Sequence, residues 1–307
     1  MRFTIVGFGE ALYDIFPGRQ VMGGAPLNAT VHAHQLGLRA AGRGVLVTRV
    51  GQDALGGQLL EELKQRGLCT DYIQTDPDHA TGRVYVSMGA GGEPSFDIVR
   101  QAAWDWINFD PDTGTLASQC DAVCFGTLVQ REGQARNALY RFLGACPQAI
   151  RLLDVNLRQQ YYDRRVLQRS LEAATIIKAN QHELGVLADL LGLDGGAGFA
   201  APSFGRAQAL LKRFRQVQAV VVTRGRQGTA AVTGTGVVEA EPATYPPAEG
   251  ADAVGAGDAC AAAVLIGLVL RWPWEKTLNL ANHAGAYVAS QPGATPLLPE
   301  AILAMVA

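Results

Sequence analysis

Short apolar runs alternate along the chain with longer stretches in which apolar residues recur at helical spacing. This order is typical of repeated strand–helix–strand units, which place a mostly parallel sheet between two layers of helices. The pattern therefore predicts an α/β fold. The expected core strands are Phe3 to Gly7, Gly44 to Val50, Ala122 to Phe125, Ile150 to Asp154, Thr175 to Lys178 and Ala219 to Thr223.

Amphipathic segments between these strands predict the helices that cover the sheet. In Leu55 to Gly67, three leucines share one face, and the final glycine suits the left-handed conformation that commonly ends a helix. The other expected helices are Pro26 to Leu36, Gln134 to Leu143, Gln181 to Leu191, Phe204 to Phe214, Ala256 to Leu270 and Trp274 to Ser290.

Two segments, residues 11–22 and 81–99, do not fit the α/β alternation. The second alternates apolar and polar residues around a glycine-rich turn, which predicts antiparallel strands outside the main sheet. Because both segments interrupt the α/β series, we interpret them as a small lid on a single domain spanning residues 1–307. A sheet this small cannot bury many apolar residues alone, so we expect a homodimer through the lid. The apolar residues concerned are Val84, Val86, Phe96, Ile98 and Val99.

Composition narrows the class of protein. Hydrophobic residues make up 48% and charged residues 18% of the chain, which excludes disorder, collagen and coiled coils. The 26 basic and 28 acidic residues give a net charge of −2 without a basic stripe, so no nucleic-acid partner is expected. The longest apolar run, Ala259 to Leu270, is too short to cross a bilayer, and no signal-peptide pattern is present. The five cysteines include no C-x-x-C pair. We therefore expect a reducing, cytoplasmic location and no membrane partner.

The segment from Asp252 to Asp258 (DAVGAGD) carries the most chemistry, because it directly precedes a long apolar helix. Its small residues Gly255, Ala256 and Gly257 let the backbone approach a ligand, and the N–H groups and dipole of a helix start attract anions. Asp258 lies in the first helical turn. A carboxylate there can cap the helix or act as a general base, and this segment alone leaves both interpretations open.

Four other segments accompany this one in order along the chain: GGAPLNAT at 23–30, NQHE at 180–183, TRG at 223–225 and PGATP at 292–296. With these segments, the sequence resembles the ribokinase-like, or phosphofructokinase-B, family of carbohydrate kinases over essentially its whole length. The resemblance implies a three-layer αβα sandwich with a mostly parallel central sheet and a small β-strand lid. It also implies ATP as the phosphoryl donor and Mg²⁺ as its metal ion.

The resemblance assigns roles to individual residues. It implies that Asp258 is the general base and that Gly255, Ala256 and Gly257 hold the charge that develops on the transferred phosphoryl group. A sugar hydroxyl is too weakly acidic to attack unaided, so a nearby carboxylate fits this chemistry. Glu183 is implied in holding Mg²⁺ through water. The implied nucleotide contacts are Asn180, Thr223, Gly225 and Asn282. The implied sugar contacts are Asp14, Gly23, Gly24 and Asn28, with Arg158 as a weaker candidate.

One position departs from the family pattern D-T-x-G-A-G-D, because Ala253 stands in place of the threonine. In some family members the loop around this pair helps to hold an activating monovalent cation. Potassium is therefore a candidate cofactor. Its site would lack the threonine hydroxyl here, and the remaining ligands would be Asp252 and nearby backbone carbonyls.

The segments GEALYDIFP, LLDVNLR and PGATPLLP are most similar to the fructokinase branch of this family. We therefore expect ATP-dependent phosphorylation of a primary hydroxyl of a hexose, with fructose as the first choice. The main rival is 2-keto-3-deoxygluconate kinase, because Arg158 would suit a substrate carboxylate. A nucleoside kinase, a catalytically silent sugar-binding regulator and an NAD-dependent enzyme are further alternatives. The presence of both Asp258 and Glu183 argues against a catalytically silent regulator. The dinucleotide-binding pattern G-x-G-x-x-G would need a third glycine after Gly7 and Gly9, but Leu12 stands there, which argues against an NAD-dependent enzyme.

Overall fold

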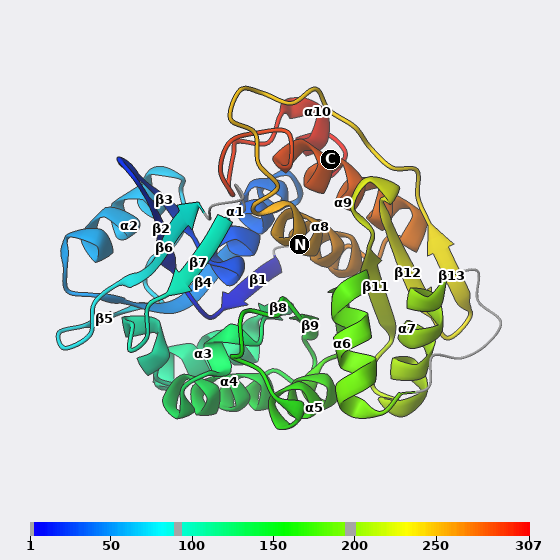
Figure 1. Ribbon diagram of the computed structural model, residues 1–307, viewed down its shortest axis with the longest axis horizontal. Coiled ribbons are helices and arrows are strands. Elements are labelled where there is room, and N and C mark those ends of the chain that lie inside the picture. Colours follow the sequence, from blue (N-terminus) through cyan, green and yellow to red (C-terminus); the bar gives the residue numbers. More distant parts are fainter. Residues whose placement is uncertain (1–2, 89–93, 194–200) are drawn as a thin grey trace.

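The computed structural model describes residues 3–88, 94–193 and 201–307. Within them, nine strands form the main sheet (Figure 1). They are β1 Phe3–Phe8, β4 Gly42–Gly51, β5 Ile73–Asp76, β8 Ala122–Phe125, β9 Ile150–Asp154, β10 Ile176–Asn180, β11 Ala219–Thr223, β12 Thr229–Thr233 and β13 Gly236–Glu239. Their order in space is β13-β12-β11-β10-β9-β8-β1-β4-β5. Within the described part of this sheet, the pairs β11–β12 and β12–β13 are antiparallel and the other pairs are parallel, so the predicted mostly parallel sheet is confirmed.

Helices cover both faces of this sheet. One layer holds α1 Ala25–Gly37, α2 Ala54–Gln65, α8 Ala256–Val269, α9 Trp274–Val288 and α10 Glu300–Leu303. The other holds α3 Pro111–Gln119, α4 Gly133–Ala145, α5 Arg164–Ala173, α6 Gln181–Leu191 and α7 Pro202–Arg213. None of the described helices is both long and apolar enough to cross a membrane.

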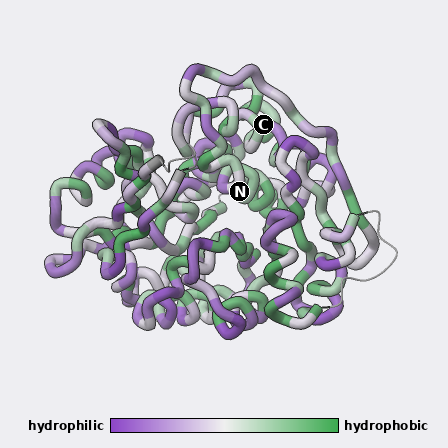
Figure 2. Tube along the Cα trace, in the orientation of Figure 1, coloured by the Kyte–Doolittle hydropathy of each residue, from purple (hydrophilic) through white to green (hydrophobic). Residues whose placement is uncertain are grey.

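Strand β1 shows why the core strands are almost continuously apolar. Its residues Val6 and Phe8 belong to the core beneath α4, whereas Phe3 and Ile5 belong to the core beneath α8. Successive side chains of a strand point to opposite faces, so a sheet covered on both sides needs apolar residues at nearly every position. Hydrophobic segments accordingly lie mostly in the middle of the molecule and hydrophilic ones along its outline (Figure 2).

Every strand and helix expected in the main sheet and its two layers is present, with ends shifted by no more than two residues. The sequence pattern did not predict α3, α5, α10, β5, β12 or β13. In α5, a charged helix with the sequence RRVLQRSLEA, only Val166, Leu167, Ser170 and Leu171 are buried. A stripe this short among arginines is a weak periodic signal.

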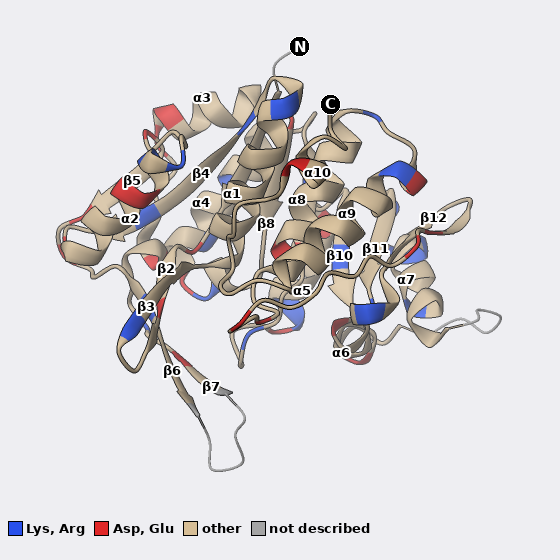
Figure 3. Ribbon diagram, turned by 90° about the horizontal axis from the view of Figure 1, so that it is seen from above, with Lys and Arg blue, Asp and Glu red and all other residues tan. Residues whose placement is uncertain are grey.

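A second, four-stranded sheet projects from the main body (Figure 3). Its strands are β2 Leu12–Phe16, β3 Arg19–Gly23, β6 Gly82–Met88 and β7 Pro94–Ile98, in the order β3-β2-β6-β7. The pairs β2–β3 and β6–β7 are antiparallel, as predicted, but β2 and β6 pair parallel. Both strands follow main-sheet strands that run in the same direction, which explains the parallel pairing. The predicted glycine-rich turn, at residues 89–93, lies outside the described residues.

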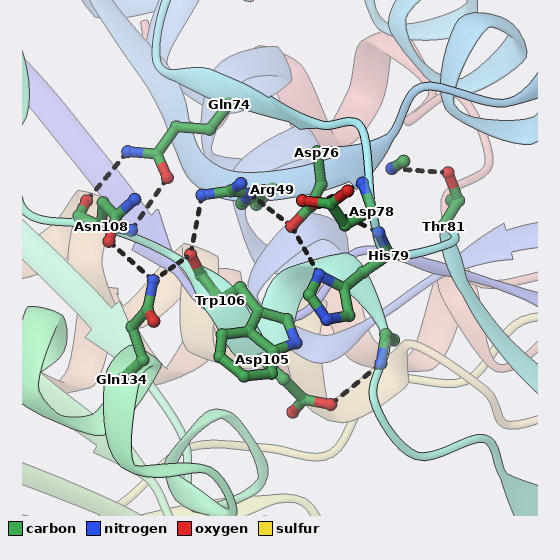
Figure 4. A network of polar contacts seen from close by, with 12 residues as sticks. Arg49, Gln74, Asp76, Asp78, His79, Thr81, Asp105, Trp106, Asn108 and Gln134 are labelled. Atoms are coloured by element: carbon green, nitrogen blue, oxygen red, sulfur yellow. Dashed lines mark hydrogen bonds and ion pairs between the residues drawn. The ribbon is translucent and has the colours of Figure 1, made fainter.

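Polar contacts fix the chain where it passes from β5 into this smaller sheet (Figure 4). Asp76 pairs with Arg49 Nε at 2.8 Å and lies 3.1 Å from Nδ1 of His79. Two bonds run from Thr81 to Asp53, where the hydroxyl donates to Oδ1 at 2.6 Å and the backbone N–H to Oδ2 at 3.0 Å. The start of β6 is thereby anchored to the main body.

Burial within the chain changes the argument for a dimer through the smaller sheet. Val84, Val86 and Ile98 are buried in the single chain, and only Phe96 among the five apolar residues is strongly exposed, at 47%. The homodimer stays a prediction, and the large apolar side chains that this sheet exposes are Phe96 and, on β6, Tyr85.

Candidate active site

The start of helix α8 has the geometry of an anion site. Gly255 precedes the helix in a left-handed conformation, with φ of 80°, and a Cβ atom there would lie 2.3 Å from the Ala294 carbonyl oxygen. Only glycine fits this position. The first N–H groups of a helix lack partners within it. The N–H of Ala256 donates to the Ala253 carbonyl at 3.3 Å, so the N–H groups of Gly257 and Asp258 are the ones left for a negatively charged ligand.

The role of Asp258 as a general base stays a prediction, but the structure shows where this residue forms hydrogen bonds. Its side chain makes no helix-capping hydrogen bond. Instead, Oδ2 of Asp258 accepts a hydrogen bond of 2.8 Å from Nδ2 of Asn28, on helix α1. The carboxylate therefore faces a residue that was predicted to bind sugar, 230 positions away in the chain.

The other predicted sugar contacts lie around this pair. A Cβ atom on Gly23 would be 2.9 Å from Oδ2 of Asp14, so this glycine leaves room for the carboxylate. Gly24 has φ of 114° and precedes α1, and its missing side chain allows a close approach to the backbone of Glu10. The structure thus gathers Asp14, Gly23 and Gly24 next to α1, which carries Asn28.

Asp252 lies in the same pocket as Asp14. The pocket is lined by Asp14, Phe16, Arg19, Val21, Asp252, Val254, Gly293 and Ala294. Asp252 accepts hydrogen bonds from the backbone N–H groups of Val254, at 3.0 Å, and Gly293, at 3.3 Å. Its carboxylate therefore braces the loop before α8 against the segment near the C-terminus, and a cation role for it stays a prediction.

A buried ion pair that sequence reasoning missed lies beside the helix start. Lys178 and Asp154 are direct register partners on β10 and β9, and Nζ of Lys178 is 2.9 Å from both carboxylate oxygens. A Cβ atom on Gly257 would be 3.3 Å from this Nζ. Burial by itself would lower the pKa of Lys178, but the charge of the Asp154 carboxylate outweighs this effect, so the pKa is raised overall. The ammonium therefore stays charged next to the anion site. In the sequence, the signal that could have revealed this ion pair was a lysine, Lys178, within an otherwise apolar strand.

Three carboxyl groups of the site have raised pKa values. Burial raises the pKa of Asp258 and of Asp14 to about 6, and that of Glu10 to about 7. The Arg158 guanidinium opposes all three shifts. The positive charge of the exposed Arg158 therefore acts on all three carboxyl groups, and its contact with the sugar stays a prediction.

Glu10 is a second residue that sequence reasoning missed, although it stands in the quoted segment GEALYD. It is 3% exposed, and its Oε2 atom has no hydrogen-bond partner among the described residues. The folded state binds the Glu10 proton more tightly than the unfolded state, so stability is lost as pH rises from about 4.5 to about 7.

We therefore expect Glu10→Gln to stabilise the protein at pH 8, by up to about 3 kcal/mol, and to change little below pH 5. The reason is that the amide removes the charge that is costly to bury. The measurement is the free energy of unfolding in urea at both pH values, with Glu249→Gln, at an exposed position, as the control. A destabilised Glu10→Gln protein at pH 8 would contradict the expectation.

On the nucleotide side, Asn180 and Glu183 cap helix α6 reciprocally. Oδ1 of Asn180 accepts from the Glu183 N–H at 2.9 Å, and Oε2 of Glu183 accepts from the Asn180 N–H at 2.8 Å. Oε1 of Glu183 accepts from the Leu157 N–H at 3.1 Å. The described residues contain no group of three or more His, Cys, Asp or Glu that could hold a metal. A water-mediated contact of Glu183 with Mg²⁺ stays a prediction.

The remaining predicted nucleotide contacts have structural partners in the protein itself. Thr223 ends β11, and Gly225 lies in the turn after it with φ of 58°. Asn282 on α9 accepts from the Thr229 N–H at 2.9 Å and donates to the carbonyls of residues 240 and 241. Asn282 thus fastens α9 to β12 and to the segment after β13, while its contact with adenine stays a prediction.

The carboxylate of Asp258, in the first turn of α8, thus lies against Asn28, one of the predicted sugar contacts. Residues 9–301 match the model of the pfkB family of carbohydrate kinases, and the chain belongs to that family. The predicted class of enzyme, a phosphotransferase, is confirmed.

Named relatives and solved structures agree with this family. A fructokinase from Vibrio alginolyticus is 26% identical over 95% of this chain and 94% of its own length. An ATP-bound fructokinase from Xylella fastidiosa matches with a TM-score of 0.84 at 23% identity, over 99% and 98% of the two chains. A 2-dehydro-3-deoxygluconokinase from Thermotoga maritima matches with a TM-score of 0.81 at 17% identity, over 100% and 98%.

A double-mutant fructokinase from Vibrio cholerae, with fructose, ADP and a potassium ion bound, matches with a TM-score of 0.79 at 21% identity, over 99% and 98% of the two chains. These three structural likenesses establish the fold alone. Their sequence identities are too low to transfer a substrate from one protein to another.

Proposed function

We propose that this kinase transfers the γ-phosphoryl group of ATP to a primary hydroxyl of a neutral hexose, with fructose as the first candidate. The observation that carries the proposal is the 2.8 Å hydrogen bond between Asp258 and Asn28, which joins the base to the sugar contacts. The named fructokinase relative, at 26% identity, supports the same substrate.

The chemistry follows from the placement of the charged groups. Asp258 accepts the proton of the sugar hydroxyl while its oxygen bonds to the γ-phosphorus, and the bond from that phosphorus to the β-phosphate oxygen breaks to release ADP. The N–H groups after Gly255 and the ammonium of Lys178 stabilise the negative charge of the transferring group. Mg²⁺ bound to the ATP phosphates would neutralise part of the remaining charge.

The balance of charge favours a neutral sugar over a keto acid such as 2-keto-3-deoxygluconate. Arg158 suits a substrate carboxylate, yet its charge already lowers the pKa values of Glu10, Asp14 and Asp258. A fourth carboxylate would compete for the same guanidinium and would be repelled by the ionised groups. Sugar hydroxyls, in contrast, can donate hydrogen bonds to all three carboxyl groups.

We expect kcat/KM for fructose to exceed that for 2-keto-3-deoxygluconate by at least about tenfold at pH 8, where Asp14 and Asp258 are ionised. The measurement is coupled ADP release across a panel of hexoses, keto acids and nucleosides. Equal or higher kcat/KM for the keto acid would overturn the neutral-sugar proposal in favour of its rival. Absence of turnover with every member of the panel would overturn hexose phosphorylation itself.

Three further features complete the proposal. The smaller sheet serves as a lid that closes over the sugar, because Asp14 lies on β2 and Gly23 ends β3. A homodimer forms through this lid by way of Phe96. A potassium ion binds at the Asp252 loop, as the potassium-bound Vibrio cholerae fructokinase suggests by its similar fold. The cytoplasmic location stays a prediction.

A further inference from the structure

We propose that His32 is a positioning residue for phosphoryl transfer, because its ring holds the Ala294 carbonyl against Gly255 at the start of helix α8. The inference rests on the proposed function in that this helix start stabilises the transferring group. Ala294 belongs to residues 292–298, which follow α9 and which we call the PGATPLL segment after their sequence.

The first support is the hydrogen bond that His32 makes. Nε2 of His32 lies 2.9 Å from the Ala294 carbonyl oxygen. Burial lowers the pKa of His32 to about 4, so the ring is neutral near pH 7 and carries one N–H. A carbonyl oxygen only accepts hydrogen bonds, so Nε2 carries this proton and donates it to Ala294. A Cβ atom on Gly255 would collide with the same oxygen. His32 therefore fixes the atom against which Gly255 packs.

The second support is the place of His32 on helix α1. Asn28 and His32 are four residues apart in this helix, so their side chains lie on the same face, one turn from each other. Asn28 donates to the Asp258 carboxylate at 2.8 Å. Both Asn28 and His32 are buried, so water competes little for their hydrogen bonds. One face of α1 therefore contacts the proposed base and, one turn further along, the backbone that packs against the anion site.

The third support is that side chains hold the PGATPLL segment at two further carbonyls. Nη1 of Arg66, the residue after α2, donates to the Thr295 carbonyl at 2.9 Å. Nε2 of Gln35, on α1, donates to the Pro296 carbonyl at 3.3 Å. Together with the bond from His32, three successive carbonyls of the segment are bound by side chains. The segment is therefore a fixed support for the start of α8.

The loss of the His32 bond would change the start of α8. The Ala294 carbonyl belongs to a residue that is 2% exposed, and a buried carbonyl without a donor shifts toward a new one because an unpaired polar group is costly. Gly255 can follow this shift, since glycine adopts many backbone conformations. The N–H groups of Gly257 and Asp258 would then be less well directed at the transferring group, and their stabilisation of its charge depends on that direction.

A substitution that removes the ring N–H tests this role. We expect His32→Leu to lower kcat by about tenfold for the hexose of the panel with the highest kcat/KM, because misdirected donors stabilise the transition state less. The sugar KM should change by less than about threefold. The measurement is steady-state ADP release per folded protein, with the folded fraction taken from circular dichroism.

The matched control is His34→Leu. His34 is also buried on α1, two residues further along, but its Nδ1 accepts from the Gly44 N–H of β4 at 3.4 Å. This control should lose stability and keep kcat within about twofold of the unchanged protein. Equal kcat values in the two leucine variants would give His32 a purely structural role and overturn the proposal.

The conservative variant His32→Gln tests whether the N–H itself matters. Nε2 of glutamine is separated from Cα by as many bonds as Nε2 of histidine, so it can donate to the Ala294 carbonyl. We expect this variant to keep kcat within about threefold of the unchanged protein. A loss as large as that of His32→Leu would contradict a role for the hydrogen bond.

A measurement without turnover separates this inference from the proposed function. The Ala259 N–H donates to the Gly255 carbonyl at 2.8 Å, so its hydrogen exchange reports on the start of α8. Exchange should be at least about fivefold faster in His32→Leu and unchanged in His34→Leu. Equal exchange in both variants overturns the inference whatever the substrate. Faster exchange in His32→Leu, with no hexose turned over by the unchanged protein, overturns the proposed function alone.

A second variant keeps the test valid if His32→Leu folds poorly. Arg66 is half-buried, and Arg66→Ala removes the donor to the next carbonyl of the PGATPLL segment without disturbing the core. We expect kcat to fall by about threefold and exchange of the Ala259 N–H to become faster. Arg39→Ala, at an exposed arginine just after α1, should change neither. Unchanged kcat and exchange in Arg66→Ala would refute the support of α8 by this segment.

Discussion

Replacement of Asp258 by asparagine is expected to lower kcat by at least about 100-fold while the protein stays folded and still binds sugar. The asparagine has the same shape and can keep a hydrogen bond to Asn28, but it cannot accept the proton of the attacking hydroxyl. The measurement is steady-state ADP release at saturating sugar and ATP. A thermal unfolding curve close to that of the unchanged protein would show that the loss is chemical.

The matched control for this substitution is Asp112→Asn. Asp112 also lies in the first turn of a helix, α3, but it is exposed and outside the site, so the same change of charge should leave kcat unaltered. In the unchanged protein, activity should fall as pH drops through about 6, because Asp258 must be ionised to act as a base. Near-normal turnover of Asp258→Asn would remove Asp258 from this role.

Replacement of Lys178 by methionine is expected to lower the free energy of unfolding by about 3–5 kcal/mol and kcat by at least about 100-fold. The stability falls because the buried Asp154 carboxylate loses the ammonium that lies 2.9 Å from both its oxygens. The activity falls because that ammonium lies beside Gly257 at the anion site. Urea unfolding and steady-state kinetics measure the two effects separately.

The double variant Lys178→Met with Asp154→Asn separates structure from catalysis. Removal of the carboxylate charge should restore most of the lost stability, because no uncompensated ion then stays buried. The loss of kcat should persist, since no cation stands next to the helix start. A stable double variant with normal turnover would reduce the ion pair to a structural element.

Much of the fold could be predicted because its signals are local. Helix α6 begins and ends at the predicted residues, since Asn180 and Glu183 form its capping box and Gly192 adopts the left-handed conformation after it. Strands buried on both faces are continuously apolar, so their position in the chain can also be predicted from a few neighbouring residues. Helix α5 was missed because only four of its ten residues are buried, and one of these four, Ser170, is polar.

Part of the site could also be predicted, because the small residues before α8 and the reciprocal cap of α6 belong to short, contiguous motifs. Their partners could not be predicted in this way. The bond between Asp258 and Asn28 depends on how two helices far apart in sequence pack on the same face of the sheet. The resemblance suggested that both residues belong to one site, but it did not give their contact.

The sequence by itself determined most of the strands and helices of the main sheet and its two layers, which motifs the chain carries and, by resemblance, the class of reaction. Only the tertiary structure decided which charges meet. Lys178 faces Asp154 because the register of β9 and β10 aligns them. Glu183 reaches Leu157 because parallel strands bring the loops after β9 and β10 to the same edge of the sheet. Register and edge are relations between distant segments, and no local pattern of apolar and polar residues encodes them.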